Sequence, residues 1–312
     1  MKKWCLFLSV YAVLCLLAAC AARGSGEVRP GGVPSQEPQT GGETARPAES
    51  TVVCRVIAEL EGGTLILAEQ DRDAGLYTLS PADKAVTLDG ADFDPAAPGA
   101  YQALPGESLA GTTVTVTFDG GIQESWPMGL SGVTALDFST EDFDDTCRLY
   151  LDVLEDLWNT DGALNENITE LALDLSATGL TGSEREGVAY AFGAAHGLMA
   201  MEATFEELTD QGYISAEPLL ASGSEEELRE PEHYFYQWED GCLFTITERD
   251  EPVIFNEAAM GPMETGGAYE GIRFDAGKWR ASLAAYTFCN CTAGRTAGGP
   301  WSDYTVEAEM VA

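Results

Sequence analysis

The stretch Val52–Glu69, VVCRVIAELEGGTLILAE, decides the fold of the first folded part of the chain. Every second residue from Val52 to Leu60 is apolar, which is the period of a strand that buries one face. Gly62 and Gly63 then favour a tight turn, after which Thr64–Glu69 returns as a second strand. The sequence therefore predicts a β-hairpin here.

Working outward, the strand pattern continues to about Ser139. Further strands are predicted at 76–80, 114–118 and 133–138. The loop between the first two of these carries several prolines and aspartates, of which three are interpreted as solvated turn residues: Asp89, Asp92 and Asp94. Five or six short strands in so few residues predict a small all-β, OB-like barrel over 51–139.

The run Val114–Pro127, VTVTFDGGIQESWP, resembles the closing strands of a YobA-like domain found in Firmicutes lipoproteins. That family has no established activity, so the resemblance implies a fold and a location and transfers no catalytic residue. Residues 274–286 and 289–295 similarly resemble the tail of uncharacterised Firmicutes lipoproteins. OB-like barrels often bind oligonucleotides or oligosaccharides, but 51–139 holds 3 basic and 13 acidic residues, which predicts no nucleic acid partner.

From residue 140 the pattern changes to mixed helix and strand. Apolar residues between Cys147 and Trp158 have helical spacing, and the acids at 141–145 precede them, where a helix dipole favours anions. Strands are predicted at 168–175 and 198–203, with a helix between them that Ser183 and Glu186 cap and Gly197 ends. This βαβ unit predicts a parallel pair. A short helix capped by Thr204 and Glu207 follows and stops at Gly212.

The last third is predicted to return to strands. Tyr234–Trp238 and Cys242–Ile246 alternate around Asp240 and Gly241, which predicts a hairpin. Further strands are expected at 269–275, 278–291 and 303–311. Residues 140–312 are thus predicted to form an α+β domain with a mainly antiparallel sheet.

The N-terminus resembles a bacterial lipoprotein signal. Lys2 and Lys3 precede the apolar run Trp4–Leu16, and small residues lead to Cys20. The resemblance implies a signal peptide over 1–19 and acylation of Cys20, which would hold the chain to the extracytoplasmic face of the cell membrane. Residues 20–50 are predicted to be this lipidated cysteine and a disordered tether with a reach of about 30 Å. The alternatives are an uncleaved membrane anchor and an ordinary secretory peptide.

The charge is strongly acidic, with 16 Lys plus Arg, 52 Asp plus Glu and a formal net charge of −36. The predicted signal carries two of the lysines and no acid, so its removal would make the net charge −38. Such a surface repels nucleic acid phosphates and anionic lipids and accepts cations or basic partners more readily. The alternative is that acidity only maintains solubility.

The cysteines after Cys20 are odd in number. Cys54, Cys147 and Cys242 lie in apolar patterns and are interpreted as buried hydrophobic residues. Cys289 and Cys291 would share a strand face, which suits either a metal or redox pair or, more simply, core packing. The pairing of these five cysteines is left open.

No catalytic motif stands out, and no catalytic residue, metal site or cofactor is assigned. His196 is interpreted as a helix-end residue and His233 as a loop residue. Paired carboxylates of a glycoside hydrolase are conceivable, but so many acids are present that no two can be selected. Part of an EF-hand calcium loop is resembled by four residues: Asn159, Asp161, Gly162 and Asn165. The first and last ligand positions of such a loop would be Leu157 and Ile168, which cannot bind calcium, so a helix-ending turn is the preferred interpretation. Asp71 with Asp73 is likewise interpreted as a turn.

One basic cluster runs against the overall charge: Arg273, Lys278, Trp279 and Arg280. Lys278 and Arg280 would share a strand face and are candidates for binding an anionic or sugar ligand. The alternative is exposed bases paired with nearby carboxylates and Trp279 packed inward.

The preferred functional hypothesis is a membrane-anchored extracytoplasmic lipoprotein that binds a surface protein or small ligand. The alternative is a cell-envelope hydrolase of glycans or peptides that uses paired carboxylates. A solute receptor ranks third, because two similar βαβ lobes are not evident. The ligand and the oligomeric state are not indicated by the sequence.

Overall fold

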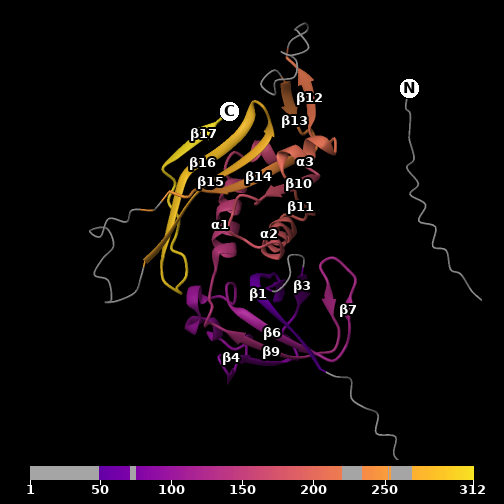
Figure 1. The fold of residues 1–312 in the computed structure, drawn as a ribbon, viewed down its shortest axis with the longest axis vertical. Coiled ribbons are helices and arrows are strands. Elements are labelled where there is room, and N and C mark those ends of the chain that lie inside the picture. Colours follow the sequence, from indigo (N-terminus) through magenta and orange to yellow (C-terminus); the bar gives the residue numbers. More distant parts are fainter. Residues whose placement is uncertain (1–48, 71–74, 220–233, 252, 254–268) are drawn as a thin grey trace, which may run out of the picture. The chain divides into compact units, whose positions relative to one another are not determined.

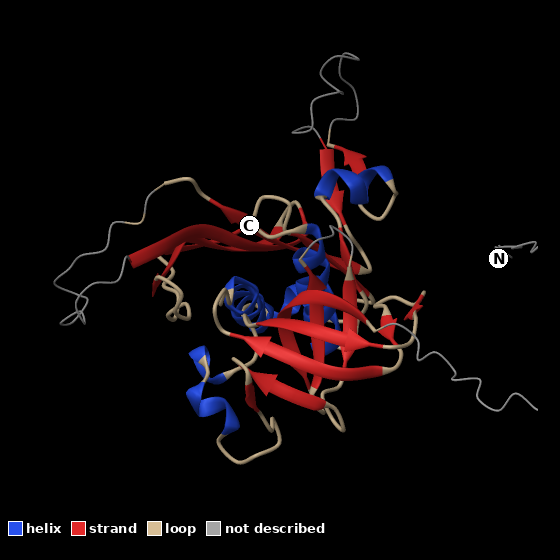
Figure 2. Cartoon of the chain, turned by 60° about the horizontal axis from the view of Figure 1, so that its bottom comes forward, coloured by secondary structure: helices blue, strands red, loops and turns tan. Residues whose placement is uncertain are grey.

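A computed structural model describes residues 49–70, 75–219, 234–251, 253 and 269–312, which belong to the compact unit Arg46–Ala312. Several predictions fall outside the described residues: the predicted signal peptide 1–19, Cys20, all but the last two residues of the predicted tether, Asp71, Asp73 and His233. The described chain is mostly β, with two large open sheets and few helices (Figures 1 and 2). No helix in this described part is long and apolar enough to cross a membrane.

The first sheet has seven strands in the hydrogen-bonded order β3-β2-β1-β6-β9-β4-β5. The bounds are β1 Ser50–Leu60, β2 Thr64–Glu69, β3 Leu76–Leu79, β4 Ala85–Leu88, β5 Ala91–Asp92, β6 Thr113–Phe118 and β9 Val133–Ser139. The short pair β7 Ile122–Gln123 and β8 Gly129–Leu130 forms a sheet of its own. The predicted first hairpin is confirmed: Leu60 pairs with Thr64, and Gly62 and Gly63 have φ of +88° and +78°.

The predicted β-rich first part is confirmed, but the described strands form an open sheet, with β3 and β5 at its two edges, and no closed barrel is found among the described residues. The loop expected to hold only solvated aspartates contains β4 and β5, and β4 pairs in parallel with β9. Asp89, at φ +48° in the turn between them, accepts hydrogen bonds from Thr140 N (2.9 Å) and Oγ1 (2.8 Å). The sequence of this loop therefore does not reveal its two strands, because β4 pairs with β9 about fifty residues away and β5 pairs only with β4.

The second sheet has the order β11-β10-β14-β15-β13-β12, and β15 also pairs with β16, which pairs with β17. The bounds are β10 Glu170–Asp174, β11 Ala200–Glu202, β12 Ser215–Pro218, β13 Tyr234–Gln237, β14 Gly241–Glu248, β15 Tyr269–Ala281, β16 Ala284–Thr296 and β17 Ala308–Val311. The helices are α1 Thr146–Asn159, α2 Gly182–Ala195 and α3 Phe205–Asp210. The predicted parallel pair joined by a helix is confirmed as β10-α2-β11, and β14 pairs with β10 in parallel as well.

Three local predictions need correction. The hairpin expected around Asp240 and Gly241 does not form, because β15 lies between β13 and β14. The buried indole of Trp238 packs against Gly241, where an added Cβ would lie 2.0 Å from a ring atom, so this glycine serves close packing rather than a reversal.

The cap of α2 is Thr181 with Glu184, and Ser183 is not the cap, because its hydroxyl accepts from Gly75 N at 2.9 Å. The strand expected to end at 275 continues to Ala281, because Gly277 pairs with both Thr245 and Thr287 instead of forming a turn. The capping box of α3, Thr204 with Glu207, is confirmed.

The main core lies where α1 and α2 pack against the second sheet. Val153 and Leu157 of α1, and Val188 and Phe192 of α2, are buried with Phe244 of β14. The same cluster includes Ile57 and Ile66 from the first sheet, and the predicted boundary at 139/140 falls between β9 and α1. Gly187 of α2 has no side chain at a point where a Cβ would lie 2.9 Å from Ile57 Cγ1, which permits this close contact.

Candidate functional site

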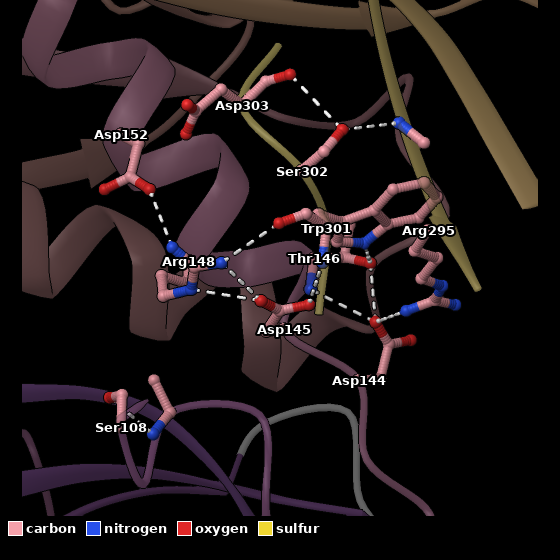
Figure 3. Close-up of polar contacts among 12 residues, drawn as sticks. Ser108, Asp144, Asp145, Thr146, Arg148, Asp152, Arg295, Trp301, Ser302 and Asp303 are labelled. Atoms are coloured by element: carbon pink, nitrogen blue, oxygen red, sulfur yellow. Dashed lines mark hydrogen bonds and ion pairs between the residues drawn. The ribbon is translucent and has the colours of Figure 1, made fainter. Parts of the chain in front are cut away.

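The first turn of α1 is organised around a buried carboxylate (Figure 3). The side chain of Asp145 is fully buried and accepts from Arg148 Nε (3.0 Å), Arg148 Nη2 (2.6 Å) and Trp301 N (3.1 Å). Gly111, with φ +91°, lies so close that an added Cβ would be 2.8 Å from Asp145 Cβ. Asp145 therefore ties the β5–β6 connection, the start of α1 and a C-terminal segment to one point.

That C-terminal segment, Trp301–Tyr304, is called the strap below. Trp301 Nε1 donates to Thr146 Oγ1 at 2.9 Å, and the guanidinium of Arg295 lies 4.3 Å from the centre of the Trp301 ring. Tyr304 OH donates to Asp156 Oδ2 at 2.8 Å. The strap thus runs along α1 from its first turn to its last turns.

A groove of about 460 Å³ lies between α1 and the strap. Its charged lining consists of one base, Arg148, and four acids: Asp152, Glu155, Asp156 and Asp303. Arg148 is already engaged, because it binds Asp145 and, at 3.2 Å, Asp152. The remaining carboxylates make the groove acidic, and Trp301 and Tyr304 contribute aromatic walls.

Two groove residues, Asp152 and Tyr304, have raised pKa values. Partial desolvation in the groove raises the pKa of Asp152, although its side chain stays largely exposed. Arg148 opposes this shift, and the charges of Asp156, Asp145 and Asp303 raise the pKa further. Burial also raises the pKa of Tyr304, and its hydrogen bond to Asp156 adds to this. Asp152 therefore holds a proton more readily than an ordinary aspartate does.

His196 does not line the groove but contacts one of its acids, Glu155. It is the C-cap of α2, as predicted, and its ring stacks on Trp158 with 3.7 Å between centroids. Its Nε2 lies 2.9 Å from Glu155 Oε2. Burial lowers the pKa of His196, although Glu155 opposes this, so this nearby base is preferentially neutral.

The structure separates the predicted basic cluster. Lys278 is 1% exposed and donates to Asp161 O just after α1, and Arg280 donates to Glu166 O further along the same segment. Arg273 pairs with Glu251 at 3.3 Å, and Trp279 packs edge-on against Phe205 with centroids 5.0 Å apart. The four residues thus form no single binding surface, and Lys278 is not an exposed base.

The turn resembling an EF-hand loop binds a cation that the chain itself supplies. The ammonium of Lys278 donates to the carbonyls of Trp158 (3.4 Å), Thr160 and Asp161 (3.0 Å) and to Asn165 Oδ1 (2.9 Å). A helix-ending turn is therefore present, and its oxygens are occupied by an ammonium group. Among the described residues, no cluster of three or more His, Cys, Asp and Glu could hold a metal ion.

The cysteines in the described part are all free thiols. Cys54, Cys147, Cys242 and Cys291 are buried, and burial raises the pKa of Cys242 and of Cys291 to about 12. Cys289 is partly exposed and does not share a face with Cys291. Asn290, at φ +54°, forms a bulge in which Phe274 pairs with Cys291 while Ala276 pairs with Phe288.

Sequence reasoning missed the groove. It placed Asp145 at a helix start but found no partner, because Trp301 and Tyr304 are about 150 residues away along the chain. No protein-family model, curated protein or solved structure matches the chain, so comparison with known proteins provides no related site.

Proposed function

We propose that this protein is a lipid-anchored, extracytoplasmic binding protein that takes a cationic partner in the groove between α1 and the strap. The observation that carries the proposal is the imbalance of the groove, which has four carboxylates against one guanidinium that is already paired. The anchor rests on the N-terminal sequence alone, in which Cys20 follows a short apolar run and small residues.

The chemistry of the groove favours an organic cation over a simple ion. Aromatic rings attract ammonium and guanidinium groups by about 0.5–2 kcal/mol, and Trp301 and Tyr304 line the groove beside the carboxylates. The net charge of −36 would also steer a basic partner toward the surface. A basic peptide segment of another surface protein fits these features.

The experiment measures binding of an oligolysine peptide to the soluble chain at several salt concentrations. We expect affinity to fall when Asp303→Asn or Asp152→Asn removes one groove charge. Glu124→Gln is the matched control. Glu124 is exposed on the connection between β7 and β8, so this substitution removes one negative charge outside the groove. Equal losses in all three variants would show diffuse attraction and would contradict a groove site.

The anchor is tested separately on the full-length chain expressed in a bacterium. We expect the protein to partition into the membrane fraction and to incorporate labelled palmitate. Cys20→Ser should abolish both. A Cys20→Ser variant that stays membrane-bound to the same extent would overturn the lipid anchor.

The OB-like assignment is also proposed, in a modified form. β1 pairs with β2 and β6, β2 with β3, and β6 with β9 in antiparallel fashion, while β9 pairs with β4 in parallel. β3 lies at one edge of this sheet, and β4, the next strand in the chain, lies beside the edge strand β5 at the other end. The OB-fold is a partly open barrel of few strands, so an open sheet is compatible with this assignment. The likeness to YobA-like domains stays a prediction.

The second candidate, an envelope hydrolase, is favoured by one observation. Asp152 is a carboxyl group whose pKa is raised beside other carboxylates, and a general acid in glycoside hydrolysis needs that property. Asp152 and Asp156 lie one helical turn apart on α1. Incubation of the soluble chain with cell-wall glycan and peptide should release fragments, and Asp152→Asn should stop the release; absence of fragments from the wild type would exclude this activity.

A further inference from the structure

β10 lies between two parallel neighbours. It pairs with β11 on one side, Leu171 opposite Ala200, and with β14 on the other, Leu171 opposite Cys242. Along the chain the order of these three strands is β10, β11, β14, but in the sheet β10 lies between β11 and β14. The chain therefore leaves β10 toward one side and returns to the sheet on the other side.

The connections also lie on opposite faces of the sheet. Leu171 and Leu173 of β10 are buried in one cluster with Val188 and Phe192 of α2. Ala172, the residue between them, is buried in another cluster with Leu208 of α3. Because neighbouring residues of a strand point to opposite faces, α2 and α3 cover opposite sides of β10. This arrangement is a topological switch point between β10 and β14, where open α/β sheets bind ligands beyond the carboxyl ends of the strands.

A crevice of about 190 Å³ lies at that point. Gly179 and Leu180 line it from the loop that follows β10, and Glu248, the last residue of β14, lines it from the other strand. The remaining lining includes Glu184 in the first turn of α2, and Asp144 and Cys147 at the start of α1. These residues differ from those of the groove beside the strap.

The crevice is built to accept hydrogen bonds. Glu248 Oε1 accepts from Gly179 N (2.7 Å) and Tyr150 OH (2.6 Å), whereas Oε2 has no hydrogen-bond donor among the described residues. Asp144 Oδ1 accepts from Thr146 and Arg295, and Oδ2 is similarly without a donor in that part of the chain. Glu184 uses Oε2 for its capping box, while Oε1 lies 3.8 Å from Arg55 Nε. Three carboxylates thus each keep one oxygen with no close donor.

A phosphate-bearing ligand does not fit. At nucleotide-binding switch points the backbone N–H groups of the first loop contact phosphate oxygens. Here Gly179 N already donates to Glu248, so the chain supplies its own anion at this position. The free acceptors call for a ligand that donates, and Leu180, Cys147 and Ile272 provide apolar walls for an aliphatic stem.

We propose that the switch-point crevice binds a guanidinium or ammonium group carried on a short aliphatic stem. The volume of about 190 Å³ lies below the roughly 300–1,000 Å³ of sites for drug-sized ligands, which limits the ligand to one such group. The source is either a free small amine or the basic side chain of a peptide. This site is independent of the groove, so either proposal can fail while the other holds.

The test titrates the soluble full chain with arginine amide, citrulline amide and an arginine-containing tetrapeptide by calorimetry. Citrulline amide has nearly the same shape and no charge. We expect arginine amide to bind and citrulline amide not to bind. Glu248→Gln should weaken arginine amide binding by about tenfold or more, the loss of one charge-assisted hydrogen bond.

Two variants keep the result interpretable. Asp144→Asn, at a carboxylate with a 42% exposed side chain, should weaken binding even if Glu248→Gln fails to fold. Asp303→Asn, which changes the groove and not the crevice, should leave the affinity for arginine amide within about twofold of the wild-type value. Binding of the amide but not the tetrapeptide supports a free amine, and the reverse supports a peptide partner. No binding of either to the folded wild type, equal binding of citrulline amide, or loss with Asp303→Asn would overturn the proposal.

Discussion

The two ends of α1 each bury one charged side chain, but they compensate that charge in different ways. At the N-terminal end the fully buried carboxylate of Asp145 meets the guanidinium of Arg148, which is 30% exposed. At the C-terminal end the ammonium of Lys278 meets three backbone carbonyls and the side-chain oxygen of Asn165. Both charges complement the helix dipole, negative at its start and positive at its end.

This difference shows which end depends more on a single side chain. Removal of Asp145 leaves behind a base that water can reach, and water can replace part of the lost interaction. Removal of the Lys278 ammonium leaves four partly buried oxygens without their common donor. The C-terminal end is therefore expected to be the more sensitive one.

The largest effect is expected from Lys278→Met, which keeps an unbranched apolar stem and deletes the ammonium. The oxygens of Trp158, Thr160, Asp161 and Asn165 then lose one donor at the same time. A hydrogen bond to a charged group contributes about 1.5–3 kcal/mol, and several are lost together here, so we expect a loss of about 3–5 kcal/mol in the free energy of unfolding measured with urea.

Lys84→Met is the matched control for this change. Lys84 is the other lysine in the described chain, and its ammonium group has no hydrogen bond or ion pair among the described residues, although its backbone N donates to Pro81 O. We expect a change within about 0.5 kcal/mol. Similar losses in the two variants would mean that the ammonium of Lys278 does not hold the end of α1.

A smaller effect is expected from Asp145→Asn at the other end. The amide keeps the size and can still accept from Trp301 N, but it loses the charge that Arg148 binds with two nitrogen atoms. Hydrogen bonds to charged groups contribute about 1.5–3 kcal/mol, so a loss near 2 kcal/mol is expected in the same urea experiment. Asp152→Asn, which removes an exposed partner of the same Arg148, should cost less than about 1 kcal/mol. The ranking fails if Asp145→Asn costs more than Lys278→Met.

The sequence predicts α1 itself but not what holds its two ends. Apolar spacing from Cys147 to Trp158 marks the helix, and the acids before it mark its start, because both signals are local. Lys278 is 117 residues from Asp161, and its strand pattern indicates only that it shares a face with Arg280. Burial of a lysine is rare, so exposure is the reasonable expectation without the fold.

The same limit applies to the acidic groove and to the second sheet. Four groove acids among 52 are not distinguishable in the sequence, because the strap that groups them is far away in the chain. The hairpin expected at Asp240 and Gly241 fails for a similar reason, since β15 inserts between the two strands. Local turn chemistry predicts a change of direction but cannot exclude a strand that arrives later.

Acid should affect the N-terminal end of α1 and spare the other end. Burial alone would raise the pKa of Asp144, but hydrogen bonds from Thr146 and the charge of Arg295 outweigh it and hold this pKa below the ordinary 3.8. The folded state thus releases this proton more readily than the unfolded state does. The resulting stability is present above pH 3.8 and is lost as pH falls through the lower folded value.

Asp144→Asn should therefore flatten the fall in unfolding free energy between about pH 4 and pH 2, relative to the wild type. Lys278 stays protonated across this range, so Lys278→Met should shift the whole curve downward without changing its slope. If Asp144→Asn and the wild type show the same slope of unfolding free energy against pH, the acid sensitivity comes from other carboxylates.

The smallest effect is expected where the strap reaches the C-terminal half of α1. Tyr304→Phe deletes one hydroxyl, whose hydrogen bond to the exposed Asp156 is 2.8 Å long. A hydrogen bond of this kind contributes about 0.5–1.5 kcal/mol. A double-mutant cycle with Asp156→Asn isolates the pair from the general loss of charge, and a coupling of about 0.5 kcal/mol is expected.

The size of that coupling also decides how the strap is held. Trp301 donates to Asp145 and Thr146 at the start of α1 and accepts from Arg148 there, so the strap is expected to be fixed mainly at this end. A coupling between Tyr304 and Asp156 larger than the cost of Asp145→Asn would reverse this view. The strap would then be held chiefly from the Lys278 end, and the groove between it and α1 would open first at Trp301.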